Sequence, residues 1–163
     1  MPGIIESYIH TGKQIGVLVE LRCQTKTTAM TLEFKTLATE IAMHIAASPD
    51  VEYIRTSDIS DRVIRELEKQ LTLEAESEAF KQCLRSISLY DQFYIRDNSI
   101  TIEDLIKLSI AQLAEEITVR RFARFAIESD DGNPPDPNDG VPANPLPNSP
   151  TPWASEAETS EDV

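Results

Sequence analysis

The residues that most often carry out chemistry are few in this sequence and widely separated. His10 and His44 fall in different predicted elements, and no cysteine, carboxylate or second histidine accompanies His44 at metal-ligand spacing. Cys23 has no obvious base, and the five glycines form neither a G-x-G motif nor a phosphate-binding loop. The sequence therefore predicts no catalytic site, no metal site and no cofactor.

The remaining reactive or charged side chains have structural interpretations. The pair Glu115-Glu116 falls at the end of a predicted helix, where we attribute it to the helix dipole and to solvation. Cys23 and Cys83 are 60 residues apart, a spacing that fits no metal or redox motif. We expect both cysteines to be buried, reduced thiols.

The charge balance excludes some classes of partner. The 163 residues include 15 Lys and Arg against 28 Asp and Glu, and the net charge is −13. A surface that binds a phosphate backbone needs excess positive charge, so we expect no direct nucleic-acid binding. No apolar run approaches the roughly 18–20 residues that span a bilayer, and the first residues resemble neither a signal nor a transit peptide. We therefore expect a soluble protein without a membrane partner.

The composition changes abruptly near Ser129. The segment 129–163 holds eight of the ten prolines and eight acidic residues but no Lys or Arg. It has too few large apolar residues to offset the entropy of ordering, so we predict a disordered, acidic, Pro-rich tail after a globular domain over 1–128. Trp153 is the only large aromatic residue of the tail and is either a short docking anchor or an unstructured passenger.

Three apolar runs predict the sheet. The runs 3–9 and 15–22 are separated by a polar connection that contains Gly12, which is typical of a β-hairpin. The second run is nearly continuous in apolar residues and is predicted to be the central strand. A third strand is predicted at 118–127.

The third run alternates only in part. We predict that Val119, Ala123, Phe125 and Ile127 face inward, with Arg120 and Arg124 facing solvent. Its arginines resemble a basic patch with interleaved aromatics. In so acidic a chain we interpret them as the solvated side of a strand rather than a nucleic-acid site.

Apolar residues at a period of 3.6 predict the helices. One helix is expected over 31–47 and another over 102–116, which opens on a capping box formed by Thr101 and Asp104. His44 lies off the apolar stripe and is predicted to lie on the helix surface. The sequence therefore predicts an α+β fold in which a small antiparallel sheet packs against helices.

A helical, coiled-coil-like projection is predicted at 61–87. Its two apolar stripes are interrupted by a polar stretch around Ala75 that contains neither glycine nor proline. The segment is either one long helix or two helices that turn back near Ala75.

Five blocks of sequence, in the same order, resemble the elongation factor Ts family. They lie within residues 3–127 and are Ile4–His10, Ile15–Thr25, Glu33–Lys35 leading to Ile41–Ser48, Ser88–Asp97 and Val119–Phe125. The single copy of these blocks is similar to the short bacterial, cyanobacterial and organellar forms. The resemblance implies a guanine-nucleotide exchange factor, not an enzyme of bond chemistry, that binds elongation factor Tu carrying GDP and leaves when GTP enters.

The resemblance also implies where the partner would be contacted. In the family, a Thr-Asp-Phe-Val-Ala segment after the central strand acts as a wedge that helps to dislodge the magnesium ion of the GTPase. The matching residues here are Thr25, Lys26, Thr27 and Thr28. The hairpin belongs to the partner-facing edge in the family, and its matching residues here are His10, Gln14, Ile15 and Gly16. The projection would serve homodimerisation or further partner contacts.

The sequence departs from the family pattern in three places. Lys26 and Thr27 replace the carboxylate and the phenyl ring of the wedge. The small helical domain that precedes the core in the family is expected to be lacking, and the projection is shortened. In addition, Phe93 replaces a proline.

These departures leave two functions open. The first is exchange on elongation factor Tu, weakened by the altered wedge. The alternative is a degenerate or polyprotein-derived module that binds a translation partner without catalysing exchange. The bacterial cytoplasm is the expected location, with the plastid stroma as the alternative.

Overall fold

Three antiparallel strands form the sheet of this α+β fold, which a computed structural model describes over residues 1–72 and 76–127. β1 (Gly3–Ile9), β2 (Ile15–Arg22) and β5 (Thr118–Ala126) are arranged in the order β1-β2-β5. The prediction that β2 is central is therefore confirmed. The predicted acidic tail at 129–163 lies outside the described residues.

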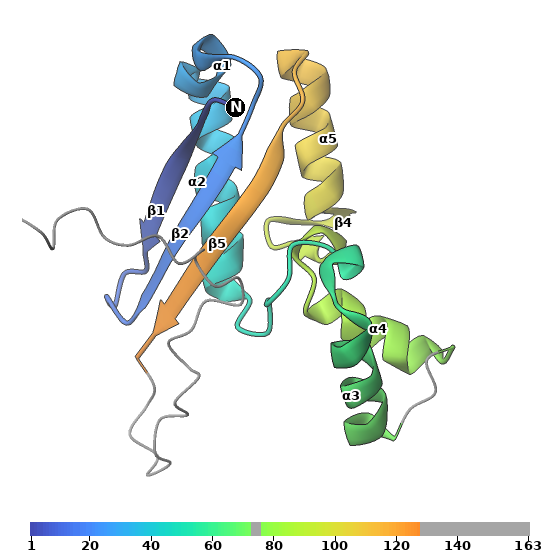
Figure 1. Cartoon of the computed structure of the whole chain (residues 1–163). Coiled ribbons are helices and arrows are strands. Elements are labelled where there is room, and N and C mark those ends of the chain that lie inside the picture. The colour runs from blue at the N-terminus through green and yellow to red at the C-terminus, as the bar shows by residue number, and fades with distance from the viewer. Residues whose placement is uncertain (73–75, 128–163) are drawn as a thin grey trace, which may run out of the picture.

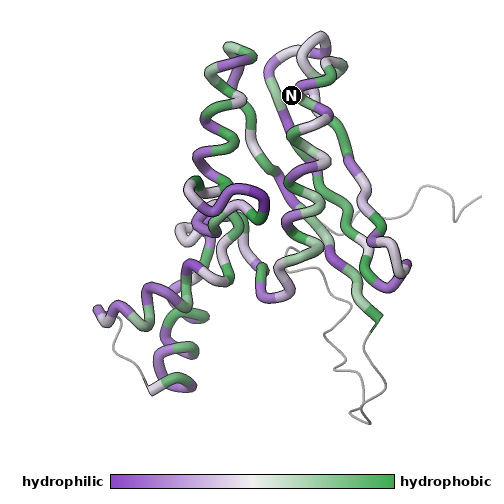
Figure 2. Tube along the Cα trace, turned by 180° about the vertical axis from the view of Figure 1, so that it is seen from behind, coloured by the Kyte–Doolittle hydropathy of each residue, from purple (hydrophilic) through white to green (hydrophobic). Residues whose placement is uncertain are grey.

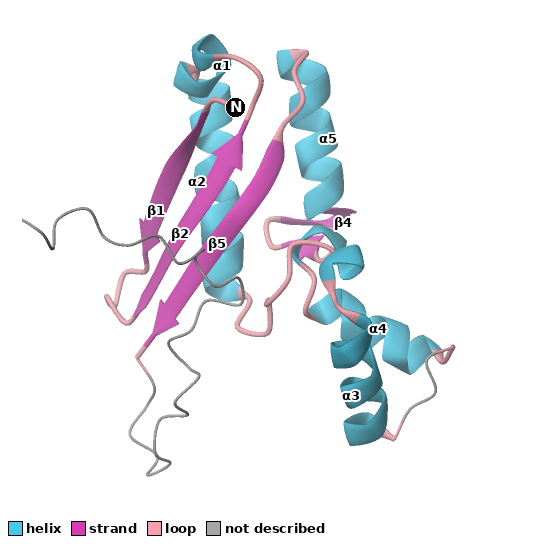
Figure 3. Cartoon of the chain, viewed as in Figure 1, coloured by secondary structure: helices cyan, strands magenta, loops and turns pink. Residues whose placement is uncertain are grey.

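The remaining elements follow in chain order between β2 and β5 (Figures 1 and 3). They are α1 (Lys26–Met30), α2 (Leu32–Ala47), the 3-10 turn Thr56–Asp58, α3 (Asp61–Leu71), α4 (Glu78–Ser86), the 3-10 turn Leu89–Asp91, β3 (Phe93–Tyr94), β4 (Asp97–Thr101) and α5 (Ile102–Leu113). The short helix α1 and the small β3–β4 hairpin were not predicted. The capping box of α5 is present as predicted.

The core lies between the sheet and α2. Val17, Val19 and Leu21 alternate along β2 and are fully buried, whereas Leu18 on the other side of the strand is 47% exposed. Figure 1 shows α2 running behind the strands. α2 buries all the residues of its apolar stripe, together with Ala46 and His44: Phe34, Leu37, Ala38, Ile41, Ala42 and Ile45 form the stripe. The opposite side of the sheet is not covered by any described helix (Figure 1).

The projection consists of two helices, α3 and α4, rather than one long helix. α3 ends at Leu71, where Thr72 adopts a left-handed conformation with φ of 53°, and α4 begins after the capping residue Ser77. Both helices lead away from the sheet (Figure 1), and Figure 2 shows hydrophobic and hydrophilic residues interleaved along them. Phe80 is the buried residue of α4, and α3 buries none.

A β-bulge changes which side chains of β5 face the helices. The register with β2 shifts between Glu20 and Leu21, which leaves Arg120 as the extra residue. Arg120 is exposed, as predicted. Beyond the bulge the alternation is reversed, so that Arg124 pairs with Val17 on the side that the helices cover.

The prediction for the inward residues of β5 is therefore largely wrong. Val119 is buried, as predicted. Phe125 and Ile127 are 55% and 70% exposed, and Ala123 shares their open side of the sheet. Arg124, predicted to face solvent, instead donates to the main-chain oxygen of Ala46 at the end of α2. The one inserted residue accounts for the whole difference, because a shift of one position exchanges the two sides of a strand.

His44 is also placed differently from the prediction. It is only 1% exposed, because the segment that contains Gln92 and Tyr94 covers the side of α2 that the sheet does not. Its Nε2 lies 2.8 Å from the side-chain oxygen of Gln92, whose amide nitrogen donates to the main-chain oxygen of Ser86. A neutral imidazole that carries its proton on Nε2 therefore links α2 to the end of α4. The buried Nδ1 has no hydrogen-bond partner among the described residues.

Burial of His44 should make the stability of the fold depend on pH. Burial lowers the pKa of His44, although the hydrogen bond to Gln92 opposes this. As pH falls through about 6.5, the unfolded chain takes up a proton that the folded chain resists, so the free energy of unfolding should decrease. The slope can reach about 1.4 kcal/mol per pH unit.

Urea unfolding between pH 7.5 and 5.5 measures this slope. The variant His44→Gln should flatten it, whereas His10→Gln, which alters an exposed histidine, should not. An unchanged slope in His44→Gln would contradict the assignment.

The end of α5 should be stabilised by a glycine. Ala114 closes this helix in a left-handed conformation with φ of 55°. Because that conformation is strained for an L-residue with a Cβ, Ala114→Gly should raise the free energy of unfolding by about 1 kcal/mol. Ala111→Gly inside the same helix should lower it by about 0.5–1 kcal/mol. Urea titration of the two variants compares them, and destabilisation by both would contradict the expectation.

Candidate partner-binding surface

The residues at the wedge position begin the short helix α1, directly after β2. Thr25 is the capping residue, and its hydroxyl oxygen accepts from the main-chain nitrogen of Thr28 at 3.2 Å. Lys26 and Thr27 occupy the first turn and are exposed, whereas Thr28 is only 7% exposed. Three of the four predicted residues are therefore exposed, and Thr25 and Thr28 hold the turn that carries Lys26 and Thr27.

A carboxylate from a distant part of the chain binds the start of this turn. Glu115 accepts from the main-chain nitrogens of Gln24 and Thr25 at 3.2 and 3.0 Å and from the hydroxyl of Thr25 at 2.6 Å. These hydrogen bonds, first of all the one from the hydroxyl of Thr25, hold the pKa of Glu115 below its usual value. The carboxylate is therefore charged at neutral pH.

Cys23 holds the same segment from the core. Its thiol is fully buried and donates to the main-chain oxygen of Thr25 at 3.2 Å. Burial, and then the charge of Glu115, raise the pKa of the Cys23 thiol. The prediction of a buried, reduced cysteine is confirmed for Cys23, whereas Cys83 is only partly buried.

The hairpin residues lie between β1 and β2. His10 is exposed, and its Nδ1 lies 3.2 Å from the hydroxyl of Tyr8. Gln14 is exposed and accepts from the main-chain nitrogen of Ile127 at 2.8 Å. Ile15 and Gly16 are half-buried.

A shallow apolar groove of about 590 Å³ lies beside the hairpin. Three of the predicted residues, Gln14, Ile15 and Gly16, line it together with Leu18, Phe125 and Ile127. His10 does not line it. Ile9 also lines this groove, and Ile5 is exposed on the same open side of the sheet.

The two predicted contact segments are at opposite ends of the sheet. β2 runs from the hairpin at one end to α1 at the other, as Figure 3 shows. Its eight residues separate the two segments by roughly 25 Å at the usual rise of a strand. The structure therefore does not bring them together, and a partner that touched both would have to extend along the sheet.

Two of the three arginines of β5, Arg121 and Arg124, contact other parts of the fold and are not gathered in one patch. Arg121 lies 2.6 Å from Glu20, which also accepts from Arg22 at 2.7 Å. Partial burial acts to raise the pKa of Glu20, but the two guanidinium groups outweigh it and hold the pKa below its usual value. Arg124 is turned to the end of α2, so the arginines point in different directions.

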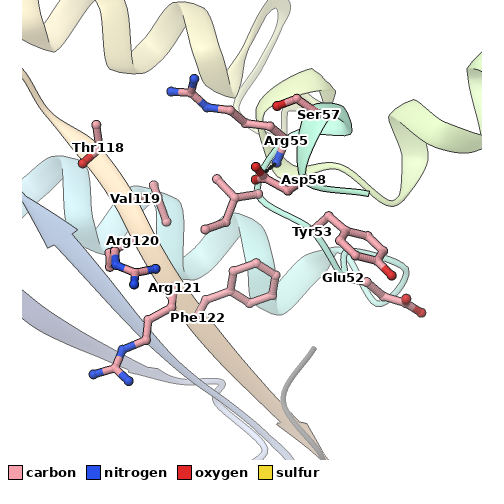
Figure 4. A pocket seen from close by; sticks show the side chains of 11 residues that line it. Glu52, Tyr53, Arg55, Ser57, Asp58, Thr118, Val119, Arg120, Arg121 and Phe122 are labelled. Carbon is pink, nitrogen blue, oxygen red and sulfur yellow. Dashed lines mark hydrogen bonds between the residues drawn. The ribbon is translucent and has the colours of Figure 1, made fainter. Parts of the chain in front are cut away.

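A second groove, of about 650 Å³, separates β5 from the loop at 52–58 (Figure 4). Val119 and Phe122 line it from the strand, and Tyr53, Arg55 and Asp58 line it from the loop. Acidic and basic residues both border this groove, so it has no strong preference for either sign of charge.

The described part of the chain holds neither a metal-binding cluster nor a helix that could span a membrane. No group of three or more His, Cys, Asp or Glu residues in 1–72 and 76–127 is arranged to hold a metal ion. Within the same residues, every helix is too short or too polar to cross a bilayer.

Sequence comparison places this fold in a family. The family description "Elongation factor TS" matches residues 1–129. The chain is 48% identical over 138 residues to the chloroplastic elongation factor Ts of Guillardia theta, a match that covers 77% of this chain and 63% of that protein. The elongation factor Ts of Rippkaea orientalis is 45% identical over 139 residues, which cover 77% and 55% of the two chains.

A third relative agrees with these matches. The chloroplastic elongation factor Ts of Pyropia yezoensis is 45% identical over 145 residues, which cover 80% of this chain and 66% of that protein. The chain thus spans about half to two thirds of the length of these relatives. The match over residues 1–129 includes the three-stranded sheet, the five α-helices of the described residues and both candidate contact segments. The chain therefore belongs to the elongation factor Ts family.

Proposed function

We propose that this protein promotes nucleotide exchange on elongation factor Tu. It would bind the GTPase in its GDP form, favour release of GDP, and leave when GTP binds. The observation that carries the proposal is the exposed turn at the wedge position, which Thr25 and Glu115 hold in place. The family match covers the whole described fold, including this turn. The relatives that support it carry the name of this factor in bacteria and in chloroplasts.

Such an activity makes and breaks no covalent bond. An exchange factor can act only by binding the nucleotide-free GTPase more tightly than the GDP-bound form, since equal affinity for both would shift nothing. The work is therefore done by contact residues. We assign one contact to Thr25, Lys26, Thr27 and Thr28 at α1, and a second to His10, Gln14, Ile15 and Gly16 at the hairpin.

The distance between these contacts constrains the mode of binding. Because α1 and the hairpin lie at opposite ends of the sheet, the GTPase would have to lie along the domain rather than cap one end of it. Of the two contacts, the one at α1 is a turn whose main chain is held by hydrogen bonds from the buried residues Cys23 and Thr28 to Thr25. We therefore assign the loosening of the nucleotide site to α1 and additional affinity to the hairpin.

The composition of the turn favours a second candidate function. Lys26 carries the opposite charge to the carboxylate of the family pattern, and Thr27 lacks its aromatic ring. Replacing Phe by a small side chain at a buried contact costs roughly 2–4 kcal/mol, and 1.4 kcal/mol is a factor of ten in affinity or rate. The alternative is a module that binds a translation partner without accelerating exchange.

The remaining parts of the proposal concern organisation and location. We propose a partner-binding domain over 1–128 and a separate tail over 129–163, in agreement with the extent of the family match. We also propose that two copies can pair through the projection formed by α3 and α4, since α3 buries none of its residues within the described fold. The relatives come from bacteria and chloroplasts, which supports the cytoplasm or the plastid stroma.

Release of a fluorescent GDP analogue from the cognate elongation factor Tu tests exchange. Addition of this protein should accelerate release by about tenfold or more, within the usual range of coupling between two binding sites. Binding should be measured in parallel with GTPase stripped of nucleotide. Binding without acceleration would support the alternative function, and the absence of both would contradict both candidates.

Restoring the family residues in the turn should strengthen exchange. The double variant Lys26→Asp with Thr27→Phe should raise the rate of GDP release by about tenfold, because it restores an acidic group and an apolar insertion. The same two changes at Lys35 and Thr36, an exposed Lys-Thr pair on α2, provide the matched control and should leave the rate unchanged. If the double variant binds the GTPase but releases GDP no faster, α1 is not the part that loosens the nucleotide.

A further inference from the structure

We propose that Glu115 is a positioning residue that holds α1 in the orientation required for nucleotide release. This proposal rests on the proposed exchange function, because it concerns the same turn. Glu115 would act through the turn rather than by touching the partner. It lies 90 positions away from Thr25 in the sequence.

The three hydrogen bonds of Glu115 satisfy the polar groups at which β2 turns into α1. One carboxylate oxygen accepts from the main-chain nitrogens of both Gln24 and Thr25, and the other accepts from the hydroxyl of Thr25. That hydroxyl is oriented by donating to Glu115, and its oxygen then accepts from the main-chain nitrogen of Thr28. The carboxylate therefore fixes the residue that caps α1, and through it the first turn.

Glu115 follows α5, a helix that is anchored in the core and capped at both ends. α5 is anchored in the core by Ile102 and Ile106, and its first turn is closed by the capping box of Thr101 and Asp104. At the other end, the left-handed conformation of Ala114 ends the helix immediately before Glu115. The position of the carboxylate is therefore set by α5, not by the segment that it binds.

A second constraint acts on the same segment from the opposite direction. The buried thiol of Cys23 donates to the main-chain oxygen of Thr25, and the buried side chain of Thr28 faces the interior. Thr25 is thus held through its nitrogen, its hydroxyl and its main-chain oxygen. Without Glu115, the main-chain nitrogens of Gln24 and Thr25 lose their partner, and the hydroxyl of Thr25 keeps only its 3.2 Å hydrogen bond to the hydroxyl oxygen of Thr28. Lys26 and Thr27 would then no longer be presented in one orientation.

The positioning role has a direct readout that needs no GTPase. Amide hydrogen exchange, followed by NMR on the full chain, should show the main-chain nitrogens of Gln24 and Thr25 exchanging about tenfold faster in Glu115→Ala. Amides of β2 and α2 should be unaffected. Glu116→Ala is the matched control, since Glu116 is exposed, is adjacent in sequence, and makes no hydrogen bond or ion pair with another described residue.

The functional readout is GDP release at saturating concentration of this protein. Glu115→Ala should reduce the acceleration about fivefold or more, whereas Glu116→Ala should match the unaltered chain. Glu115→Gln keeps the size of the side chain but removes the charge, and it should also reduce the acceleration. It provides the test if the alanine variant fails to fold, which the urea midpoint would show.

The outcomes separate this proposal from the exchange function on which it rests. If the unaltered chain does not accelerate GDP release, the exchange function fails, while hydrogen exchange still reports whether Glu115 holds the turn. If the chain is active and Glu115→Ala loosens residues 24–28 without slowing GDP release, the positioning role is overturned. Unchanged hydrogen exchange at Gln24 and Thr25 would overturn it as well.

Discussion

The burial of one side of β2 against α2 is the interaction on which the rest of this structure depends. Val17 and Leu21 face the helix, while Leu18 between them faces out. Because α2 covers the buried side of β2, β1 and β5 pair with the two edges of β2. The two ends of the strand then decide where α1 and the hairpin lie. The separation of the two candidate contact segments is thus a consequence of how the core is built.

The turn at α1 depends on a second, long-range constraint. A five-residue helix cannot maintain itself in water, because helix nucleation is costly and few hydrogen bonds follow it. Here the missing stability comes from Glu115 and Cys23, which bind the two sides of Thr25. The turn is therefore held in place by α5 and by the core. In the proposed complex, the main chain of this turn would not have to be ordered during binding.

The arginines show how an acidic chain uses its few cations. Arg22 and Arg121 flank Glu20 on the open side of the sheet, and together they outweigh the cost of its partial burial. Arg124 donates to one of the last main-chain oxygens of α2, which otherwise lack partners and carry the negative end of the helix dipole. Each of these groups is therefore used in the fold, and the apparent basic patch in the sequence is dispersed.

The order of the sheet, α2, α5 and the cap at Thr101 could be predicted from the sequence. The spacing of apolar residues and the capping box are local properties that do not depend on distant neighbours. Tertiary structure decided the features that depend on distant neighbours. His44 is buried only because a later segment packs on α2. The bulge at Arg120 reverses β5 through its pairing with β2. The attribution of Glu115 to the helix dipole was wrong, because an acidic residue at the C-terminal end of a helix opposes the dipole rather than complementing it. This mismatch was the signal in the sequence that Glu115 has a partner elsewhere. Only the folded chain shows that this partner is Thr25, because no local pattern relates residues 90 positions apart.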